Sequence, residues 1–265
     1  MRLHIHHETV YRYDSTLAHS AQLLRLTPRL DDGQRIVDWQ LSLPAPASAG
    51  TDAYGNRQHL LVLDTPRDLI HIVAEGVVET HPATAAADDA TLPAALFLRD
   101  TPLTRCDAGL GAFADTYRNL IARHGREALL DLMADLLDRM PYRLGGTHAG
   151  TPAADAFALG QGVCQDHAHV FIAACRQLGL PARYVSGYLF TEHDGHVASH
   201  AWAEVCCGGH WHGFDVSNNC IPDERYVRLA IGLDYLEAGP VRGVRRGGGQ
   251  ESLHSLARVA LAQQQ

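Results

Sequence analysis

The chain has 265 residues, of which 46% are hydrophobic, and a formal net charge of −8 at pH 7. This length and composition allow one large or two modest domains with a sizeable core, and they exclude a disordered chain. The acidic balance excludes a typical nucleic-acid binder, so we expect no nucleic-acid partner. We find neither the apolar run of a signal peptide nor a stretch approaching the roughly 20 apolar residues of a membrane span, so we expect a cytoplasmic protein without a membrane partner.

Residues 1–90 favour β-structure. Segments 3–6, 37–43 and 70–74 alternate or run apolar over strand lengths, and prolines and a Tyr-Gly-Asn turn separate them. We therefore expect an antiparallel, sandwich-like N-terminal domain. It offers no acid, base or metal cluster at a mechanistic spacing, so we interpret it as a scaffold or a substrate-orienting module.

A change in composition between residues 82 and 104 indicates a domain boundary. The segment Ala83–Ala90 is rich in alanine, and prolines follow at positions 93 and 102. We therefore divide the chain into a β-rich domain, residues 1–90, and a second domain, residues 91–265. In the second domain, apolar residues recur at helical spacing over 110–121 and 129–140, and 155–159 predicts a short helix.

A glycine-flanked cysteine, Cys164, begins a further predicted helix. Apolar residues recur at three- and four-residue spacing from Val170 to Leu178, and Gly179 ends the pattern. Unpaired N–H groups and the positive end of the helix dipole favour a thiolate at this position, and the thiolate is the nucleophilic form of cysteine. A buried structural cysteine is the alternative interpretation.

Two β-rich segments around Gly208-Gly209 predict a hairpin after a strand over 182–190. With the two glycines as the loop, residue 207 lies opposite residue 210, and Trp202 lies opposite Asp215. His200 is then diagonal to Asp215 on one face, with Cα atoms roughly 7–8 Å apart, which an imidazole and a carboxylate can span. Cysteine, histidine and aspartate are the nucleophile, the base and the base-orienting group of a thiol acyl-transfer enzyme.

The order of the predicted elements is typical of an α+β fold. Helices come first in the second domain, and an antiparallel sheet follows them. Alternation over 253–261 predicts a final strand near the end of the chain.

Four motifs in order resemble the bacterial transglutaminase-like family, whose members are described as cysteine proteases. They are G-x-G-x-C-x-D-x-A, R-Q-L-G-L-P-A-R-Y-V-S-G-Y, S-H-A-W-A-E-V and W-x-G-F-D, and residues 23–29, 52–56 and 226–249 are also similar to the family. The resemblance implies a papain-like, transglutaminase-like core preceded by the family's β-rich region. It also implies that Cys164, His200 and Asp215 form the catalytic triad.

Such a triad predicts a cysteine-nucleophile enzyme that acts on amide bonds, a peptidase or amidase, through a thioester intermediate. Water would give hydrolysis, whereas an amine acceptor would give a transamidase. A peptide bond, a glutamine side-chain amide and an isopeptide or γ-glutamyl linkage all remain candidate substrates. A catalytically inactive interaction module is the other alternative. The chemistry needs no cofactor, and the sequence leaves the oligomeric state open.

Other residues are candidates for oxyanion stabilisation or substrate binding: Gln161, Gln165, Trp202, Arg245 and Arg246. The N–H of Cys164 is the expected first oxyanion donor, and either glutamine is a candidate for the second. Trp202 would shield the triad imidazole from water. The two arginines, with Arg242, stand among glycines, where they would hold a carboxylate or phosphate or else form a solvated loop.

The histidines allow two further interpretations. His167 is a competing base three residues after Cys164, but it lacks the carboxylate partner that the hairpin offers His200. The chain's 17 histidines also raise the question of a metal site. Because there is no Cys-x-x-Cys pair and because His167 and His169 point in different directions on a helix, we expect no metal.

Two other residue types have structural interpretations. We interpret Asp166 as a structural partner of the helix start, and we expect the six cysteines to be reduced.

Overall fold

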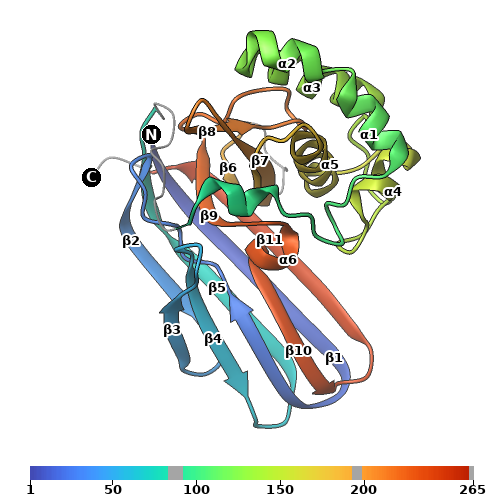
Figure 1. The fold of residues 1–265 in the computed structure, drawn as a ribbon. Coiled ribbons are helices and arrows are strands. Elements are labelled where there is room, and N and C mark those ends of the chain that lie inside the picture. The colour runs from blue at the N-terminus through green and yellow to red at the C-terminus, as the bar shows by residue number, and fades with distance from the viewer. Residues whose placement is uncertain (83–91, 193–198, 263–265) are drawn as a thin grey trace.

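The computed structural model describes residues 1–82, 92–192 and 199–262, which form two β-sheets with helices packed on the second (Figure 1). The first sheet has seven strands: β1 (Arg2–Leu24), β2 (Gln34–Ser42), β3 (Ala47–Thr51), β4 (Arg57–Leu63), β5 (Arg67–Thr80), β10 (Val241–Gly247) and β11 (Glu251–Leu261). The second has four strands: β6 (Ala182–Leu189), β7 (Ser199–Cys207), β8 (His210–Phe214) and β9 (Tyr226–Gly232). The helices are η1 (Ala94–Leu98), α1 (Ala108–Asp115), α2 (Arg118–His124), α3 (Arg126–Arg139), α4 (Ala153–Leu159), α5 (Cys164–Gln177) and α6 (Tyr235–Ala238). The expected α+β class is confirmed.

The long strand β1 organises the first sheet because it runs through both halves of a sandwich-like unit. Its first half pairs with β5 and β11, and its second half pairs with β4 and β10, all antiparallel. Strands β2 and β3 are end strands beside β5 and β4. Buried apolar side chains of both halves meet in one cluster that includes Leu24, Leu61, Leu63, Ile70 and Ile72. The strands expected at 3–6, 37–43 and 70–74 correspond to β1, β2 and β5.

The last two strands return to this first sheet. β10 and β11 pair with the edge of β1 that β4 and β5 leave open. Without them, a strand of 23 residues would expose a long row of unpaired backbone groups. The expected strand over 253–261 is confirmed as β11, but residues 241–261 lie with the N-terminal sheet although the sequence division places them with the second domain. The alanine-rich boundary segment, residues 83–90, lies outside the described residues.

The second unit is built around α5. Its sheet has the strand order β8-β7-β6-β9, and α5 packs against β7 (Figure 1). Phe171 of α5 is buried in one core with Ala201 and Ala203 of β7, and the surrounding helices contribute Leu110, Leu132, Leu136 and Phe157. The helices expected over 129–140 and 155–159 are confirmed as α3 and α4, whereas the pattern over 110–121 is divided between α1 and α2. Within the described ranges, no helix is long and apolar enough to cross a membrane.

Apolar and polar contacts join the two units. One buried cluster combines residues of both sheets: Leu3, Ile5, Val78, Tyr188, Val227 and Leu229. The His7 Nδ1 atom lies 2.8 Å from the Tyr188 hydroxyl. The Asn56 side chain donates to the Ile231 carbonyl at 2.7 Å and accepts from the Ile231 N–H at 2.9 Å. The β-rich unit is therefore held against β6 and β9, beside β7.

A buried ion cluster around Glu204 of β7 strengthens this junction. Glu204 is 2% exposed and accepts a hydrogen bond from Arg183 Nε at 2.7 Å, and it lies 2.8 Å from Arg228 Nη2. Arg228 also lies 2.7 Å from Asp31, which precedes β2. Burial by itself would raise the pKa of Glu204, but Arg228 and Arg183 outweigh it and lower the pKa to about 2.

We predict that Glu204→Gln strongly destabilises the protein. The substitution keeps the size of the side chain but removes the negative charge between two guanidinium groups. Breaking a buried ion pair costs about 3–5 kcal/mol, so we expect a loss of that order in the free energy of unfolding, measured by urea denaturation. Because the folded pKa is lowered, this stabilisation is present above the ordinary pKa of 4.5 and is lost as the pH falls towards about 2.

Glu79→Gln is the matched control, because its partner Arg35 is 67% exposed. Exposed ion pairs contribute little, so this variant should unfold as the wild type does. Equal stability of Glu204→Gln and Glu79→Gln would contradict the importance of the buried cluster.

Candidate active site

Helix α5 begins at Cys164, and a buried carboxylate shapes this start. Val163, just before the helix, is extended, and its N–H donates to Asp166 Oδ2 at 2.8 Å. The Thr147 hydroxyl donates to the same oxygen at 2.6 Å. A Cβ at Gly162 would lie 2.6 Å from the Asp166 Cβ, so this turn requires glycine. These contacts agree with a structural role for Asp166, and they hold Cys164 at the positive end of the helix.

The hairpin of β7 and β8 has the register that the sequence predicts. Cys207 lies opposite His210, and Asp215 directly follows β8. The Asp215 Oδ2 atom lies 2.6 Å from His200 Nε2, and Cys164 is close enough to His200 to help raise the pKa of its imidazole. Since Nε2 faces the carboxylate, Nδ1 is the ring nitrogen available to the thiol. The structure therefore brings together a thiol, an imidazole and a carboxylate from three separate segments.

The Asp215 carboxylate is fully buried and has several donors around it. Asn218 Nδ2 and the Tyr226 hydroxyl each donate to Oδ2 at 2.7 Å. Burial by itself would raise the pKa of Asp215, but the hydrogen bonds from His200, Asn218 and Tyr226 lower it below its usual range. The carboxylate is thus ionised at neutral pH, which suits a group that stabilises a charged imidazole.

The His200 imidazole is poised in its charged form. Its side chain is only 10% exposed, and burial by itself would lower the pKa of His200. The hydrogen bonds and charges of Asp215 and Cys164 outweigh burial and raise the pKa to about 10.

Trp202 lies where the hairpin register predicts, beside the imidazole. Its ring stacks on His200 with centroids 6.3 Å apart and 25° between the planes, and only 3% of Trp202 is exposed. Tyr226 packs edge-on against the indole at 5.3 Å. A Cβ at Gly187, the residue opposite His200 in β6, would lie 2.7 Å from Trp202 Cη2. Gly187 therefore makes the space that the indole occupies.

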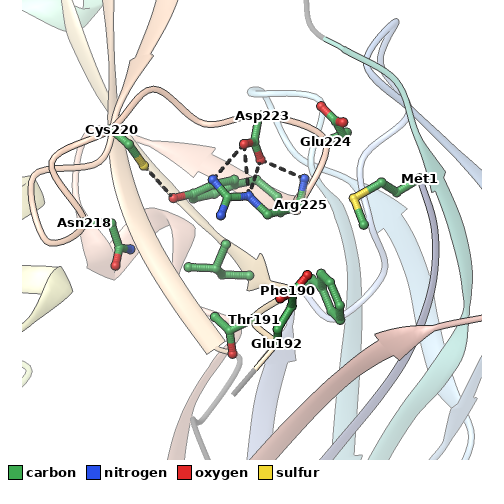
Figure 2. A pocket seen from close by; sticks show the side chains of 11 residues that line it. Met1, Phe190, Thr191, Glu192, Asn218, Cys220, Asp223, Glu224 and Arg225 are labelled. Carbon is green, nitrogen blue, oxygen red and sulfur yellow. Dashed lines mark hydrogen bonds and ion pairs between the residues drawn. The ribbon is translucent and has the colours of Figure 1, made fainter. Parts of the chain in front are cut away.

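A cavity of about 590 Å³ adjoins the Asp215 side of this cluster. Figure 2 shows Asn218 and Cys220 in its wall, with the ion pair of Asp223 and Arg225 close by. The Cys220 thiol lies 3.2 Å from the Tyr226 hydroxyl, which also contacts Asp215. The cavity is therefore separated from the His200–Asp215 pair by side chains that bind Asp215.

The two candidate oxyanion glutamines and His167 have other contacts. Gln165 donates its side-chain amide to the Ala149 carbonyl at 2.9 Å, and Gln161 packs against Gly146. His167 Nε2 donates to the Met140 carbonyl at 2.7 Å, and Nδ1 lies 2.8 Å from the Ser217 hydroxyl. Burial lowers the pKa of His167, so its ring is neutral at neutral pH. The structure pairs His200, not His167, with a carboxylate.

The arginines proposed as a substrate clamp lie in the first sheet. Arg245 and Arg246 belong to β10 and pair with β1, so the interpretation of this segment as a loop is wrong. The Arg245 side chain donates to the carbonyls of Gly247 and Gly249, and its Nε lies 3.1 Å from Glu251. The structure does not bring these arginines into the cluster around Cys164. The glycines that suggested a loop instead form the turn between β10 and β11.

The described residues offer no cluster of three or more histidine, cysteine, aspartate or glutamate side chains suited to a metal. All six cysteines are free thiols. Burial raises the pKa of Cys175 and Cys220, and burial with Asp107 raises the pKa of Cys106 to about 11. These three cysteines are therefore poor thiolates at neutral pH.

Two residues of the site are absent from the sequence interpretation, namely Asn218 and Tyr226. Asn218 lies three residues after Asp215 in a polar turn, a spacing that allows its side chain to reach back. Tyr226 begins β9, and only the pairing of β9 with β6 brings it near Asp215. The sequence near Asp215 therefore gave a weak indication of Asn218 and no indication of Tyr226.

Comparisons with known proteins agree with this architecture. Residues 3–79 match the model of the bacterial transglutaminase-like N-terminal region, and residues 115–216 match that of the transglutaminase-like superfamily. An uncharacterized protein of Mycobacterium tuberculosis is 31% identical over 277 residues, covering 92% of this chain and 87% of the relative. The chain belongs to the bacterial transglutaminase-like family.

Two further similarities cover nearly the whole length of both chains compared. An uncharacterized protein of Mycobacterium leprae is 27% identical over 97% of this chain and 98% of its own length. The crystal structure of a "putative cysteine protease" from Cytophaga hutchinsonii superposes with a TM-score of 0.80 at 21% identity, covering 100% of this chain and 92% of that one. The transglutaminase-like core and its preceding β-rich region therefore recur together as one fold.

We predict that Asp215→Asn lowers the pKa of His200 by roughly 1–3 units, because the nearest opposite charge is lost while burial remains. A nuclear magnetic resonance titration of the imidazole protons measures this shift. Asp64→Asn is the control, since it alters an exposed histidine–aspartate contact at His19 and should leave the His200 signal unchanged. An unchanged His200 pKa in Asp215→Asn would contradict the electrostatic account.

Proposed function

We propose that this family member is a cysteine-nucleophile acyl-transfer enzyme that hydrolyses amide bonds, as a peptidase or amidase. The observation that carries the proposal is the position of the His200 ring, which contacts Asp215 through Nε2 and lies close enough to Cys164 for Cys164 to help raise the pKa of the imidazole. Together with the chain's family, this arrangement supports Cys164 as nucleophile, His200 as acid and base, and Asp215 as the group that orients His200.

In the first step, the Cys164 thiolate attacks the carbonyl carbon of the amide, and a sulfur–carbon bond forms. The N–H of Cys164 is among the first N–H groups of α5, which have no acceptor within the helix, so it can donate to the oxyanion. His200 gives a proton to the leaving nitrogen as the carbon–nitrogen bond breaks. An amine leaves, and the acyl group remains on Cys164 as a thioester.

In the second step, water attacks the thioester carbonyl while His200 accepts its proton. The sulfur–carbon bond breaks, a carboxylic acid leaves, and the Cys164–His200 pair is restored. A primary amine in place of water would form a new amide, which is the transamidase alternative. The acyl acceptor therefore distinguishes the two reactions, and the thioester is common to both.

We further propose that the protein works in a reducing compartment such as the cytoplasm. A thiolate nucleophile must stay reduced to attack, and all six cysteines are free.

We predict that iodoacetamide labels Cys164 selectively at pH values well below about 8.5, the ordinary thiol pKa. In the proposed mechanism His200 supplies the positive charge that stabilises the thiolate, whereas the pKa values of Cys106, Cys175 and Cys220 are raised. Mapping each cysteine by peptide mass spectrometry across pH measures this. His200→Ala should move labelling of Cys164 to higher pH, and His212→Ala, outside the site, should not.

Turnover can be tested with a peptide library in water labelled with oxygen-18. We expect products whose new carboxylate carries one heavy oxygen, lost in Cys164→Ala and retained in Cys207→Ala, a variant of another partly exposed cysteine. Products that incorporate an added primary amine instead would identify a transamidase. Selective labelling of Cys164 with no turnover of any amide would contradict the enzymatic proposal and favour the inactive interaction module.

A further inference from the structure

The strand β9 is an end strand of the second sheet, and its pairing with β6 is interrupted once. Ala230 lies opposite Ser186, whereas Arg228 lies opposite the next residue of β6. Leu229 is therefore an extra residue in β9, which makes a β-bulge. A bulge bends its strand and changes the direction of the side chains beyond it. Since β9 begins at Tyr226, this bulge decides where the Tyr226 side chain points.

The bulge turns Tyr226 to the face of the sheet that carries His200. Gly187 of β6 lies opposite His200 of β7. Leu189, two residues further along β6, lies opposite Tyr226. Residues directly opposite one another share a face, and so do residues two apart in one strand. Without the bulge, Val227 would lie opposite Leu189, and Tyr226 would point to the other face.

The β-rich unit supplies two side-chain amides to the outer edge of β9. Gln34 accepts the Arg228 N–H at 2.8 Å and donates to the Arg228 carbonyl at 2.7 Å. Asn56 accepts the Ile231 N–H at 2.9 Å and donates to the Ile231 carbonyl at 2.7 Å. Both amides are buried. Each amide therefore takes the place of a peptide group in a neighbouring strand.

The spacing of these contacts fits the bulged strand and no regular one. In a regular antiparallel strand, the N–H and C=O groups of every second residue point to the same edge. Arg228 and Ile231 are three residues apart, yet both bond the β-rich unit. In a regular β9, one of the two would turn towards β6, and a buried amide would lose its bonds to β9 at a cost. The junction therefore favours the bulged register.

Tyr226 in this register completes the surroundings of Asp215. The Asp215 Oδ2 atom lies 2.6 Å from His200 Nε2 and accepts from the Tyr226 hydroxyl at 2.7 Å. Burial and the charge of Asp215 raise the pKa of Tyr226, so the hydroxyl keeps its proton and stays a donor. Because both groups share one oxygen, Tyr226 limits how strongly Asp215 attracts the His200 proton.

We propose that Gln34 is a positioning residue of the candidate site. With Asn56 it holds the bulge in β9, and the bulge places the Tyr226 hydroxyl on Asp215. The β-rich unit thereby contributes to the geometry of the site through β9. A role in catalysis rests on the proposed function, whereas the effect of Gln34 on His200 requires no turnover.

A nuclear magnetic resonance titration of the His200 imidazole in the full-length protein tests this role. Tyr226→Phe keeps the ring but removes the donor to Asp215, so the pKa of His200 should rise by roughly half a unit. Gln34→Met keeps the length of the side chain but removes the amide, and it should raise the pKa by a similar amount. The double variant should show no larger rise than Tyr226→Phe alone, because both changes remove one contact.

Val78→Ala is the control, since it trims a buried apolar residue of the same junction that offers β9 no side-chain hydrogen bond. It should leave the pKa of His200 unchanged. If Gln34→Met does not fold, Gln34→Asn takes its place, because it keeps an amide but is one methylene group too short to reach Arg228.

An unchanged His200 pKa in either single variant, additive rises in the double variant, or an equal rise in Val78→Ala would overturn the proposal. Amide turnover is measured separately with oxygen-18. Absence of turnover together with the expected pKa shifts would contradict the enzymatic proposal but support the positioning role of Gln34.

Discussion

The alternation of side chains along β7 is the constraint on which the rest of the second unit depends. One face of this strand carries Ala201 and Ala203, whose small size lets α5 pack closely against it. The opposite face carries His200, Trp202 and Glu204, which form the site and the junction with the β-rich unit. A shift of one residue in the pairing of β7 would exchange these faces and remove both features.

The electrostatics of the candidate site follow from burial combined with hydrogen bonding. Low exposure alone would discharge both Asp215 and His200, but the two groups face one another, and Tyr226 and Asn218 add donors to the carboxylate. Their charges therefore support each other, and Cys164 helps to raise the pKa of His200. The same balance keeps Glu204 ionised in the junction between the two units, where Arg228 and Arg183 outweigh the effect of burial.

The β-rich unit packs directly against the sheet that carries the candidate site. Its long strand β1 contacts the second sheet through Leu3 and Ile5, and the last strands of the chain return to cover β1. The chain therefore begins in the β-rich unit, continues through the helices and the second sheet, and ends with β10 and β11 in the β-rich unit.

Local patterns in the sequence determined the helices α3, α4 and α5, because each depends on neighbouring residues. They also determined the hairpin of β7 and β8 and its register, which depend on one Gly-Gly turn. They also placed His200 within reach of Asp215. The contribution of Tyr226 and the return of β10 and β11 to the first sheet depended on pairing between strands far apart in the chain. Only the tertiary structure decided these, because a strand's pattern shows which face it buries but not which partner covers it.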